Sequence, residues 1–184
     1  MAELEKLLAG FGLRFKSLKD FPHCREIRET GKTFAENASL KALGYAEQTG
    51  LLTLAEDSGL CCDALEGAPG VYSARFAGEG KKDQENNAKL LKLLEKVPDN
   101  CRGAHFASAV AVARPGKLVG VVEGKVYGVI GRESRGRFGF GYDPVFYYPP
   151  FGKTFGEAAP EMKNSVSHRA QALEKAKALL AKIP

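Results

Sequence analysis

Two adjacent carboxylates, Glu56 and Asp57, follow a short apolar run and are themselves followed by Ser58 and Gly59. A carboxylate at the end of a strand can ligate Mg²⁺ or take a proton from an attacking water molecule. Two neighbouring acids also favour a bound cation, because each charge disfavours ionisation of the other. The alternative is an Asp-Ser-Gly turn in which the side chains bond the local backbone. The segment alone leaves both interpretations open.

Basic side chains gather in a second segment, residues 162–169, at the predicted start of the last helix. It contains Lys163, His168 and Arg169, whose planar guanidinium suits a phosphate or a carbonyl edge. The free N–H groups and the dipole of a helix N-terminus attract anions as well. Because cations at this end of a helix are locally unfavourable, the segment favours an anionic ligand. The alternative is a capped surface helix with solvated charges.

Three more ionisable residues lie upstream, at Glu29, Glu36 and Lys41. Glu36 stands three residues after Thr33, which is the spacing of a capping box, and it could instead offer an oxygen to a metal. Lys41 shares a helix face with Asn37 and can reach a phosphate, although a solvated lysine is the commoner case. Glu29 lies beside a flexible turn, and nothing local separates it from an ordinary loop residue.

Glycines alternate with aromatic residues over residues 138–142, directly ahead of Asp143. Around Phe140, Gly141 and Tyr142 the pattern exposes backbone between flat rings. Such a segment suits the stacking of a planar base while backbone groups read its edge. The alternative is a glycine-rich turn whose aromatic rings fill the core, and for this segment alone we favour that alternative.

The composition favours a globular protein that binds a small anion. The chain has 184 residues, 44% of them hydrophobic, which is enough to build one domain or two tightly joined lobes. Its net charge of +5 is spread along the chain. A nucleic-acid groove would show clusters of Lys and Arg with interleaved aromatics, and only Arg132, Arg135 and Arg137 come near that pattern.

Neither a membrane protein nor a disulfide scaffold is indicated. No apolar stretch is long enough to cross a bilayer, and no signal peptide opens the sequence. The four cysteines lack Cys-x-x-Cys spacing, so we expect reduced, partly buried thiols in a cytoplasmic protein.

The periodicity predicts mixed helices and strands, which is typical of an α/β or α+β fold. Apolar stripes and caps predict helices over residues 2–9, 33–50, from 83 to before 98, and 167–183, with Asp83 capping the third. β-Rich runs predict strands over residues 13–18, 51–55, 60–65, 104–112 and 119–130. Loops or turns are expected over residues 21–31, 67–70 and 131–142.

Taken together, the segments resemble a known family. The motifs occur in the order Thr33-Phe34-x-Glu36-Asn37-Ala38-x-x-Lys41-Ala42, Glu56–Leu60, Gly67–Arg75, Phe140–Pro144 and Ser167–Arg169. From about residue 3 to its end, the sequence closely resembles the inosine/xanthosine triphosphate pyrophosphatases, which are house-cleaning nucleotide hydrolases. Five ordered motifs make this resemblance far more specific than any one of them.

The resemblance implies a fold, a reaction and an assembly. The fold is α/β, with a mixed twisted sheet flanked by helices in an elongated protomer of two lobes around a central cleft, and residues 1–184 form this single domain. The reaction is Mg²⁺-dependent hydrolysis of ITP, dITP and XTP to the monophosphate and pyrophosphate. The expected assembly is a cytoplasmic homodimer that contacts neither a membrane nor a nucleic-acid polymer.

The resemblance also implies roles for individual residues. Asp57 corresponds to the general base, and Asp57 with Glu29 or Glu36 corresponds to the metal ligands, with Glu29 placed ahead of Glu36. Lys41 and Glu56 support the catalytic group. The remaining matched positions correspond to substrate-binding residues, namely Ser58, Phe140, Gly141, Tyr142, Asp143, Lys163, His168 and Arg169. Donors such as His168 and Arg169 would favour a 6-keto purine and leave ATP poorly paired.

The sequence departs from the family pattern at its start. Family members open with a β-strand and a Thr/Ser-Gly-Asn-x-x-Lys turn that cradles the triphosphate, whereas this sequence starts at the following helix. We therefore expect a start further upstream or a truncated chain. The alternatives are a catalytically weakened nucleotide-binding dimer, a nucleotide pyrophosphatase of different base preference, and a basic nucleic-acid-binding domain.

Overall fold

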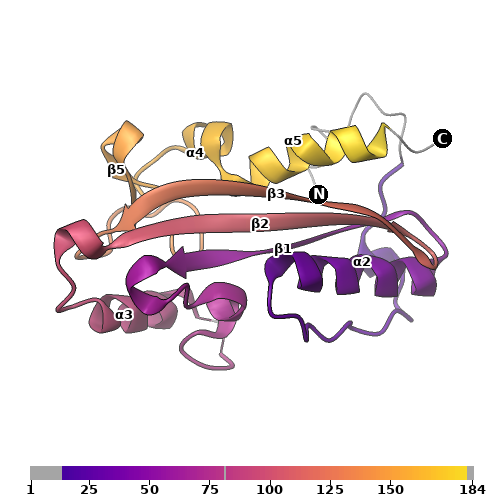
Figure 1. Cartoon of the computed structure of the whole chain (residues 1–184), viewed down its shortest axis with the longest axis horizontal. Coiled ribbons are helices and arrows are strands. Elements are labelled where there is room, and N and C mark those ends of the chain that lie inside the picture. Colours follow the sequence, from indigo (N-terminus) through magenta and orange to yellow (C-terminus); the bar gives the residue numbers. More distant parts are fainter. Residues whose placement is uncertain (1–13, 81, 182–184) are drawn as a thin grey trace. The chain divides into compact units, whose positions relative to one another are not determined.

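The computed structural model describes residues 14–80 and 82–181 and combines one sheet with four α-helices in that part of the chain (Figure 1). The helix predicted over residues 2–9 lies outside the described residues. The helices are α2 (Phe34–Thr49), α3 (Asp83–Leu93), α4 (Pro160–Val166) and α5 (His168–Leu180). The strands, in their order across the sheet, are β1 (Thr53–Cys62), β2 (Gly103–Arg114), β3 (Lys117–Ile130), β4 (Phe146–Tyr148) and β5 (Lys153–Thr154). The predicted α/β class is confirmed.

Short turns join two of the neighbouring strand pairs in this sheet, β2 with β3 and β4 with β5. β2 and β3 are joined by the two-residue turn Pro115-Gly116, where Gly116 has a φ of +71° that glycine adopts without strain. β3 and β4 pair antiparallel with Ile130 opposite Phe146, and β4 and β5 pair antiparallel with Tyr148 opposite Lys153. No helix of the described residues is both long and apolar enough to cross a bilayer.

The chain divides into two compact units, and β1, β2 and β3 contribute residues to both. The described part of unit 1 comprises residues 14–57, 108–124 and 170–181. The described part of unit 2 comprises residues 58–80, 82–107 and 125–169.

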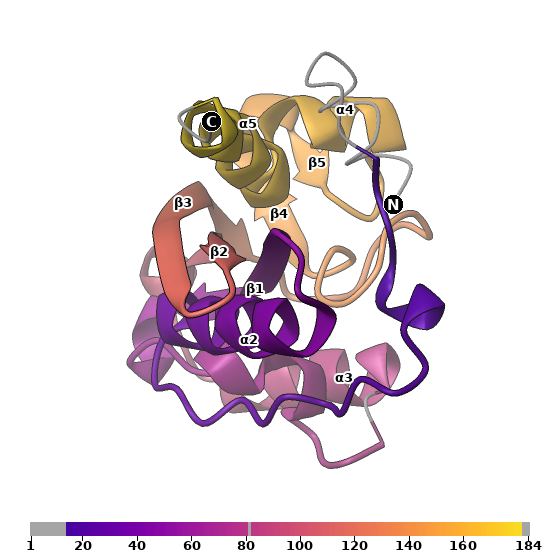
Figure 2. The same cartoon turned by 90° about the vertical axis from the view of Figure 1, so that its right-hand side faces the viewer.

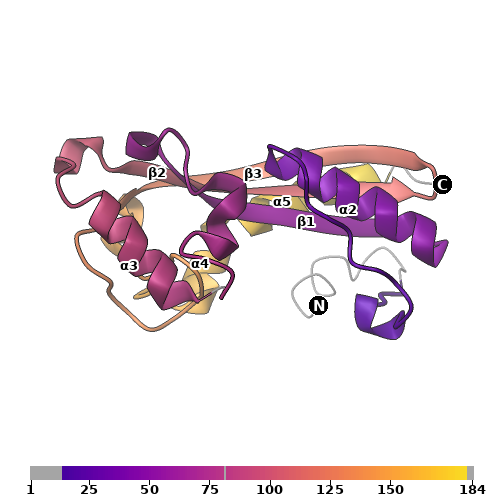
Figure 3. The same ribbon diagram turned by 90° about the horizontal axis from the view of Figure 1, so that it is seen from below.

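Unit 1 packs a helix on each face of β2. Alternate strand residues point to opposite faces, so Ala109, Ala111 and Ala113 meet the alanines of α2 while Val110 and Val112 meet α5. Figure 2 shows α2 and α5 on the two sides of the strands, and Figure 3 shows α2 lying along them from below. The α2 alanines recur every four residues, at 38, 42 and 46, as one helix face requires.

Unit 2 is built around a larger aromatic core. Phe106, Phe146 and Phe155 pack with ring centroids 4.7 to 6.2 Å apart, and Leu90 and Leu94 bring α3 and its C-terminal end against the same cluster. Burial of these large apolar side chains is the main stabilising contribution to this unit.

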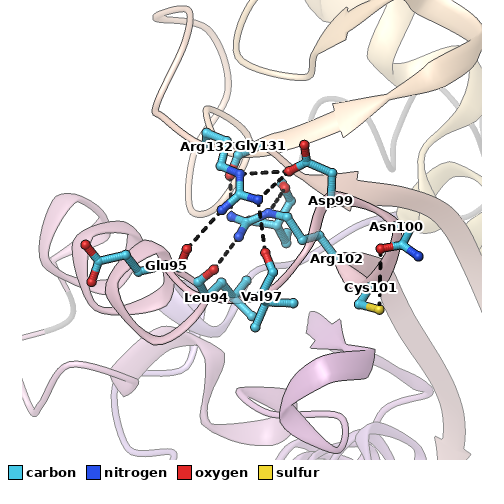
Figure 4. A network of polar contacts seen from close by, with 10 residues as sticks. Leu94, Glu95, Val97, Asp99, Asn100, Cys101, Arg102, Gly131 and Arg132 are labelled. Carbon is cyan, nitrogen blue, oxygen red and sulfur yellow. Dashed lines mark hydrogen bonds and ion pairs between the residues drawn. The ribbon is translucent and has the colours of Figure 1, made fainter.

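Two arginines tie the end of α3 to the end of β3 (Figure 4). The buried Arg102 donates to the carbonyl oxygens of Leu94, Ile130 and Gly131. Arg132 donates to Asp99 and to backbone carbonyls of residues 95 and 97. Arg132 and Arg135, which pairs with Glu133, therefore serve local contacts of unit 2, which does not favour the alternative of a nucleic-acid-binding domain.

The most consequential correction concerns β1. Two short strands separated by a turn were predicted, whereas one continuous strand runs over Thr53–Cys62 and places Asp57 in its middle. Gly59 does not form a turn. A Cβ at this position would stand 2.3 Å from Ser73 Oγ, so only glycine lets the 3₁₀ segment Gly70–Arg75 pack this close to β1. Both the strand-end and the turn interpretation of Asp57 are wrong. The predicted strand over 60–65 ends at Cys62.

Other corrections have local causes. Residues 14–18 are not a strand, because Asp20 accepts from the Ser17 N–H and the chain turns into a 3₁₀ segment at Leu18–Asp20. Asp83 is the first residue of α3 rather than its cap. Helix α5 ends at Leu180, and the predicted helix end at Ile183 lies outside the described residues. The short elements β4, β5 and α4 were not predicted.

Candidate active site

Asp57 lies in unit 1 under two side chains of α2. Lys41 Nζ lies 2.8 Å from Asp57 Oδ1 and 3.0 Å from Glu29 Oε1, so one ammonium bridges two carboxylates. Asn37 donates to Asp57 Oδ2 at 3.3 Å. Asn37 and Lys41 are four residues apart, and their shared helix face is what brings both to one carboxylate.

The loop before α2 fixes the direction of the Asn37 amide. Asn37 Oδ1 accepts from the Gly31 N–H at 2.8 Å, which leaves its amino group for Asp57. A Cβ on Gly31 would stand 2.6 Å from the Cβ of Glu36, so this close approach requires glycine. The same loop carries Glu29, whose side chain thereby reaches Lys41.

Burial and pairing act in opposite directions on this cluster. Burial raises the pKa of Asp57, although the Lys41 ammonium and the Asn37 amide act to lower it. Burial works to lower the pKa of Lys41, but its hydrogen bonds with Asp57 and Glu29 leave that pKa above the ordinary value. Lys41 is therefore charged, and Asp57 is a stronger base than a solvated aspartate.

Glu36 and Glu56 lie apart from the Lys41 bridge. The Glu36 N–H donates to Thr33 Oγ1, which is one half of the predicted capping box. The Glu36 side chain accepts from the Lys32 N–H at 2.6 Å instead of from the Thr33 N–H, so the other half does not form. Glu56 Oε1 accepts from Ser108 Oγ on β2 at 2.9 Å. Consecutive strand residues point to opposite faces, so Glu56 faces α5 while Asp57 faces α2.

A second group of predicted residues meets in unit 2. Phe140 is 60% exposed, with Lys163 Nζ 4.5 Å and Arg169 Cζ 6.0 Å from the centroid of its ring. Asp143 is buried and accepts from both Lys163 Nζ and the Phe140 N–H. Both cations lie over the Phe140 ring, and an exposed aromatic ring with cations close to it can stack with another planar ring.

The loop of residues 138–142, which we call the Phe140 loop, holds three aromatic residues, and two of them, Tyr142 and Phe140, behave differently. The Tyr142 ring is buried in the unit 2 core, and its hydroxyl donates to the Ser73 carbonyl at 2.8 Å. Burial raises the pKa of Tyr142. Tyr142 thus fills the core, as the second interpretation of the segment held, whereas Phe140 is exposed, as the stacking interpretation requires.

His168 is the first residue of α5 and lies stacked on Phe106, with ring centroids 4.9 Å apart and planes 9° apart. Burial first, and then the charges of Lys163 and Arg169, lower the pKa of His168 to about 3. The imidazole is therefore neutral at physiological pH, with one donor and one acceptor nitrogen. Its Nδ1 has no hydrogen-bond partner among the described residues.

The chain is similar to known proteins over nearly its whole length, and this similarity identifies its family. Residues 1–179 match the model of the Ham1 family. This chain belongs to the Ham1 family. It is 54% identical over 178 residues to a dITP/XTP pyrophosphatase of Desulforamulus reducens, covering 97% of this chain and 89% of that protein. It is 53% identical over 173 residues to a dITP/XTP pyrophosphatase of Geobacillus kaustophilus, covering 94% of this chain and 85% of that protein.

The fold agrees with a solved member of the Ham1 family. The structure of a HAM1 protein from Coxiella burnetii superposes with a TM-score of 0.92 at 42% identity. The match covers 99% of this chain and 93% of that one.

Candidate metal ligands in this Ham1 family chain are Asp57 and Glu29. No group of three or more His, Cys, Asp or Glu residues within the described ranges is arranged to hold a metal ion. Mg²⁺ commonly takes one or two protein carboxylates and completes its shell with water and phosphate oxygens. Two carboxylates that already share a cation, Lys41 Nζ, fit that chemistry. Glu36 is not brought to this group.

Asn37 joins this site although sequence reasoning did not include it. Its four-residue spacing from Lys41 was the available signal. The sequence does not show what packs against that helix face, so the spacing alone could not show that Asn37 donates to Asp57. Ser58 is exposed on β1, and Gly141 lies in the Phe140 loop with a φ of +60°.

Proposed function

We propose that this chain hydrolyses the deaminated purine nucleoside triphosphates ITP, dITP and XTP to the monophosphate and pyrophosphate with Mg²⁺. Relatives named dITP/XTP pyrophosphatases, about half identical over nearly the whole chain, support the reaction class. The observation that carries the proposal is the partly buried Asp57 bridged through Lys41 to Glu29. It combines a base, a fixed cation and a second acid, groups that can accept a proton and hold positive charge near a phosphoanhydride.

In the proposed mechanism Asp57 is the general base. Its carboxylate accepts a proton from a water molecule as the water oxygen bonds the α-phosphorus. The bond from the α-phosphorus to the bridging oxygen breaks, and pyrophosphate leaves with that oxygen. Because burial raises the pKa of Asp57, its carboxylate takes the proton more readily than a solvated one would. Lys41 holds Oδ1 of this carboxylate, so Asp57 is oriented before substrate arrives.

Asp57 and Glu29 are the residues that would hold Mg²⁺, which suits their hard oxygen ligands. When bound, the metal supplies positive charge that neutralises phosphate oxygens. Lys41 contributes a second, fixed positive charge in the same place, because its hydrogen bonds keep it protonated. Glu56 supports the strand segment through Ser108 of β2.

The unit 2 residues are proposed to select the base. Phe140 offers its exposed ring for stacking, flanked by Lys163 and Arg169. Arg169 and the neutral His168 offer donors that pair with the 6-keto oxygen of hypoxanthine or xanthine. Adenine presents an amino donor at that position, so ATP would leave buried donors unpaired, and such a site discriminates strongly.

The proposal includes a homodimer in the cytoplasm. The homodimer follows from the family resemblance, and sedimentation or light scattering on the purified chain tests it. The four cysteines are all free thiols, which suits a reducing compartment.

The test of the proposed function is pyrophosphate release with Mg²⁺ from ITP and XTP against ATP and GTP. Wild type and Asp57→Asn are compared, since the amide keeps the shape of the side chain but cannot accept the proton. Turnover of ITP and XTP that falls by about a hundredfold or more in Asp57→Asn supports the proposal. Binding of ITP without turnover in wild type would replace it with the weakened nucleotide-binding alternative.

A further inference from the structure

Helix α3 holds both polar groups of one residue in the Phe140 loop. Asp83 Oδ2 accepts from the Gly141 N–H at 2.6 Å, and Asn87 Nδ2 donates to the Gly141 carbonyl at 3.0 Å. Asp83 and Asn87 are four residues apart on α3, so a single helix face makes both contacts. All of these residues belong to unit 2. We refer to Asp83 and Asn87 as the Gly141 clamp.

The Gly141 clamp acts on the residue next to the exposed ring. Gly141 has a φ of +60°, a conformation that glycine adopts freely, so its own backbone does not fix the loop. On the other side, Phe140 donates its N–H to Asp143 Oδ2 and accepts from the Asp143 N–H at 3.2 Å. The backbone of Phe140 is thus tied by Asp143 within the loop and by α3 from outside it.

The side chain of Asn87 lowers the stability of the fold through one unpaired buried atom. Its amino group must face the Gly141 carbonyl, so the amide orientation is determined by that contact. This leaves Asn87 Oδ1 buried without a hydrogen-bond partner in the described residues, an arrangement that opposes folding. An apolar side chain of similar size would avoid that cost. The amide is therefore better explained by what it does to Gly141 than by its contribution to the core.

We propose that Asp83 and Asn87 are positioning residues that orient the Phe140 ring and thereby set the preference for the base. This inference rests on the proposed function, because it concerns how the base-selecting residues of unit 2 distinguish nucleotides. Neither residue touches the reacting phosphates, whose chemistry is assigned to Asp57 in unit 1. Loss of the Gly141 clamp therefore weakens binding of the base and leaves the chemical step largely unchanged.

The experiment measures kcat and KM for ITP and ATP in wild type and four variants. Asp83→Ala and Asn87→Leu each remove one half of the Gly141 clamp. Asp83→Asn keeps an oxygen that accepts from Gly141. Glu85→Ala is the matched control, because Glu85 is an exposed acid in the same helical turn that pairs with Lys82 instead of the loop. Urea denaturation of each variant measures its stability separately.

Asp83→Ala and Asn87→Leu are expected to raise the KM for ITP about tenfold and to lower the ITP-to-ATP ratio of kcat/KM by a similar factor. In both variants kcat is expected to stay within about threefold of wild type. Asp83→Asn and Glu85→Ala are expected to keep the wild-type preference.

Two results would overturn the inference in different ways. If wild type prefers ITP and the clamp variants keep that preference, losing only stability, the Gly141 clamp is structural and the proposed function stands. If wild type releases no pyrophosphate from ITP, the proposed function fails and this inference fails with it.

Discussion

The ammonium of Lys41 lies 2.8 Å from Oδ1 of Asp57, joining helix α2 to the middle of strand β1. Burial raises the pKa of Asp57 and the hydrogen bond and charge of Lys41 act to lower it. The two opposing effects keep the partly buried Asp57 ionised while it remains able to accept a proton.

Replacing Lys41 by Met is expected to shift the acidic limb of the pH profile to higher pH. A general base works only when deprotonated, so activity falls as pH falls through its pKa. Without Lys41 the raising effect of burial acts unopposed by that cation, and the pKa of Asp57 rises further. The measurement is kcat/KM for ITP against pH. Lys41→Arg keeps a positive charge and should move the limb less. An acidic limb at the same pH in Lys41→Met would show that Asp57 is not the titrating base.

Glu29 and Glu36 make different contacts, and a titration with Mg²⁺ tests which of the two is a metal ligand. Glu29→Gln is expected to raise the Mg²⁺ concentration for half-maximal pyrophosphate release by at least the roughly tenfold that loss of an outer-shell partner costs. Glu36→Gln should leave it unchanged, because the Glu36 side chain accepts from the Lys32 N–H at the start of α2 and is not brought to Asp57 and Glu29. Chelation of Mg²⁺ should stop turnover in both. A raised requirement in Glu36→Gln alone would transfer the ligand role to Glu36.

Elements with long periodic patterns were predictable from the sequence. The α2 helix has its cap at Thr33 and its left-handed Gly50 end, and β2 and β3 are long β-rich runs on either side of a Pro-Gly turn. The continuity of β1 was not predictable, because Gly59 and Asp57 resemble a turn until Ser73 is known to pack there. The strands β4 and β5 are three and two residues long, too short to show any period.

The candidate site was predictable in its members more than in its geometry. Helix spacing put Asn37 and Lys41 on one face, and only the packing of α2 on β1 showed that the face meets Asp57. The Gly141 clamp joins residues 58 positions apart, and no local pattern signals a contact over that separation. Tyr142 and Phe140 lie two apart in similar surroundings, yet one is buried and one exposed.

The buried pair of Lys163 and Asp143 is expected to matter for stability as well as for binding. Lys163→Met leaves the Asp143 carboxylate, which is 1% exposed, without its cation. Removing one partner of a buried ion pair typically costs about 3–5 kcal/mol of unfolding free energy. Arg135→Met removes the exposed pair with Glu133 and should change stability far less. Urea denaturation measures both. Equal effects of the two variants would contradict a buried charge at Asp143.

His168 is expected to make the protein less stable as the solution becomes acidic. Its pKa is about 3 in the folded chain and 6.5 ordinarily, so between these values only the unfolded chain binds the proton. The contribution of His168 to the unfolding free energy therefore rises with pH across this window, by about 1.4 kcal/mol per pH unit. The same contribution is lost as the pH falls from 6.5 towards 3.

The comparison with His168→Gln isolates this effect, because glutamine has the polar reach of the imidazole but does not titrate. Asp57 and Asp143, whose pKa values burial raises, contribute equally to both proteins. Urea denaturation between about pH 7 and pH 4 should give a steeper loss of stability for wild type than for the variant. Parallel curves for the two proteins would mean that the imidazole is protonated in the folded chain, and neutral His168 could then not be part of the base-selecting group.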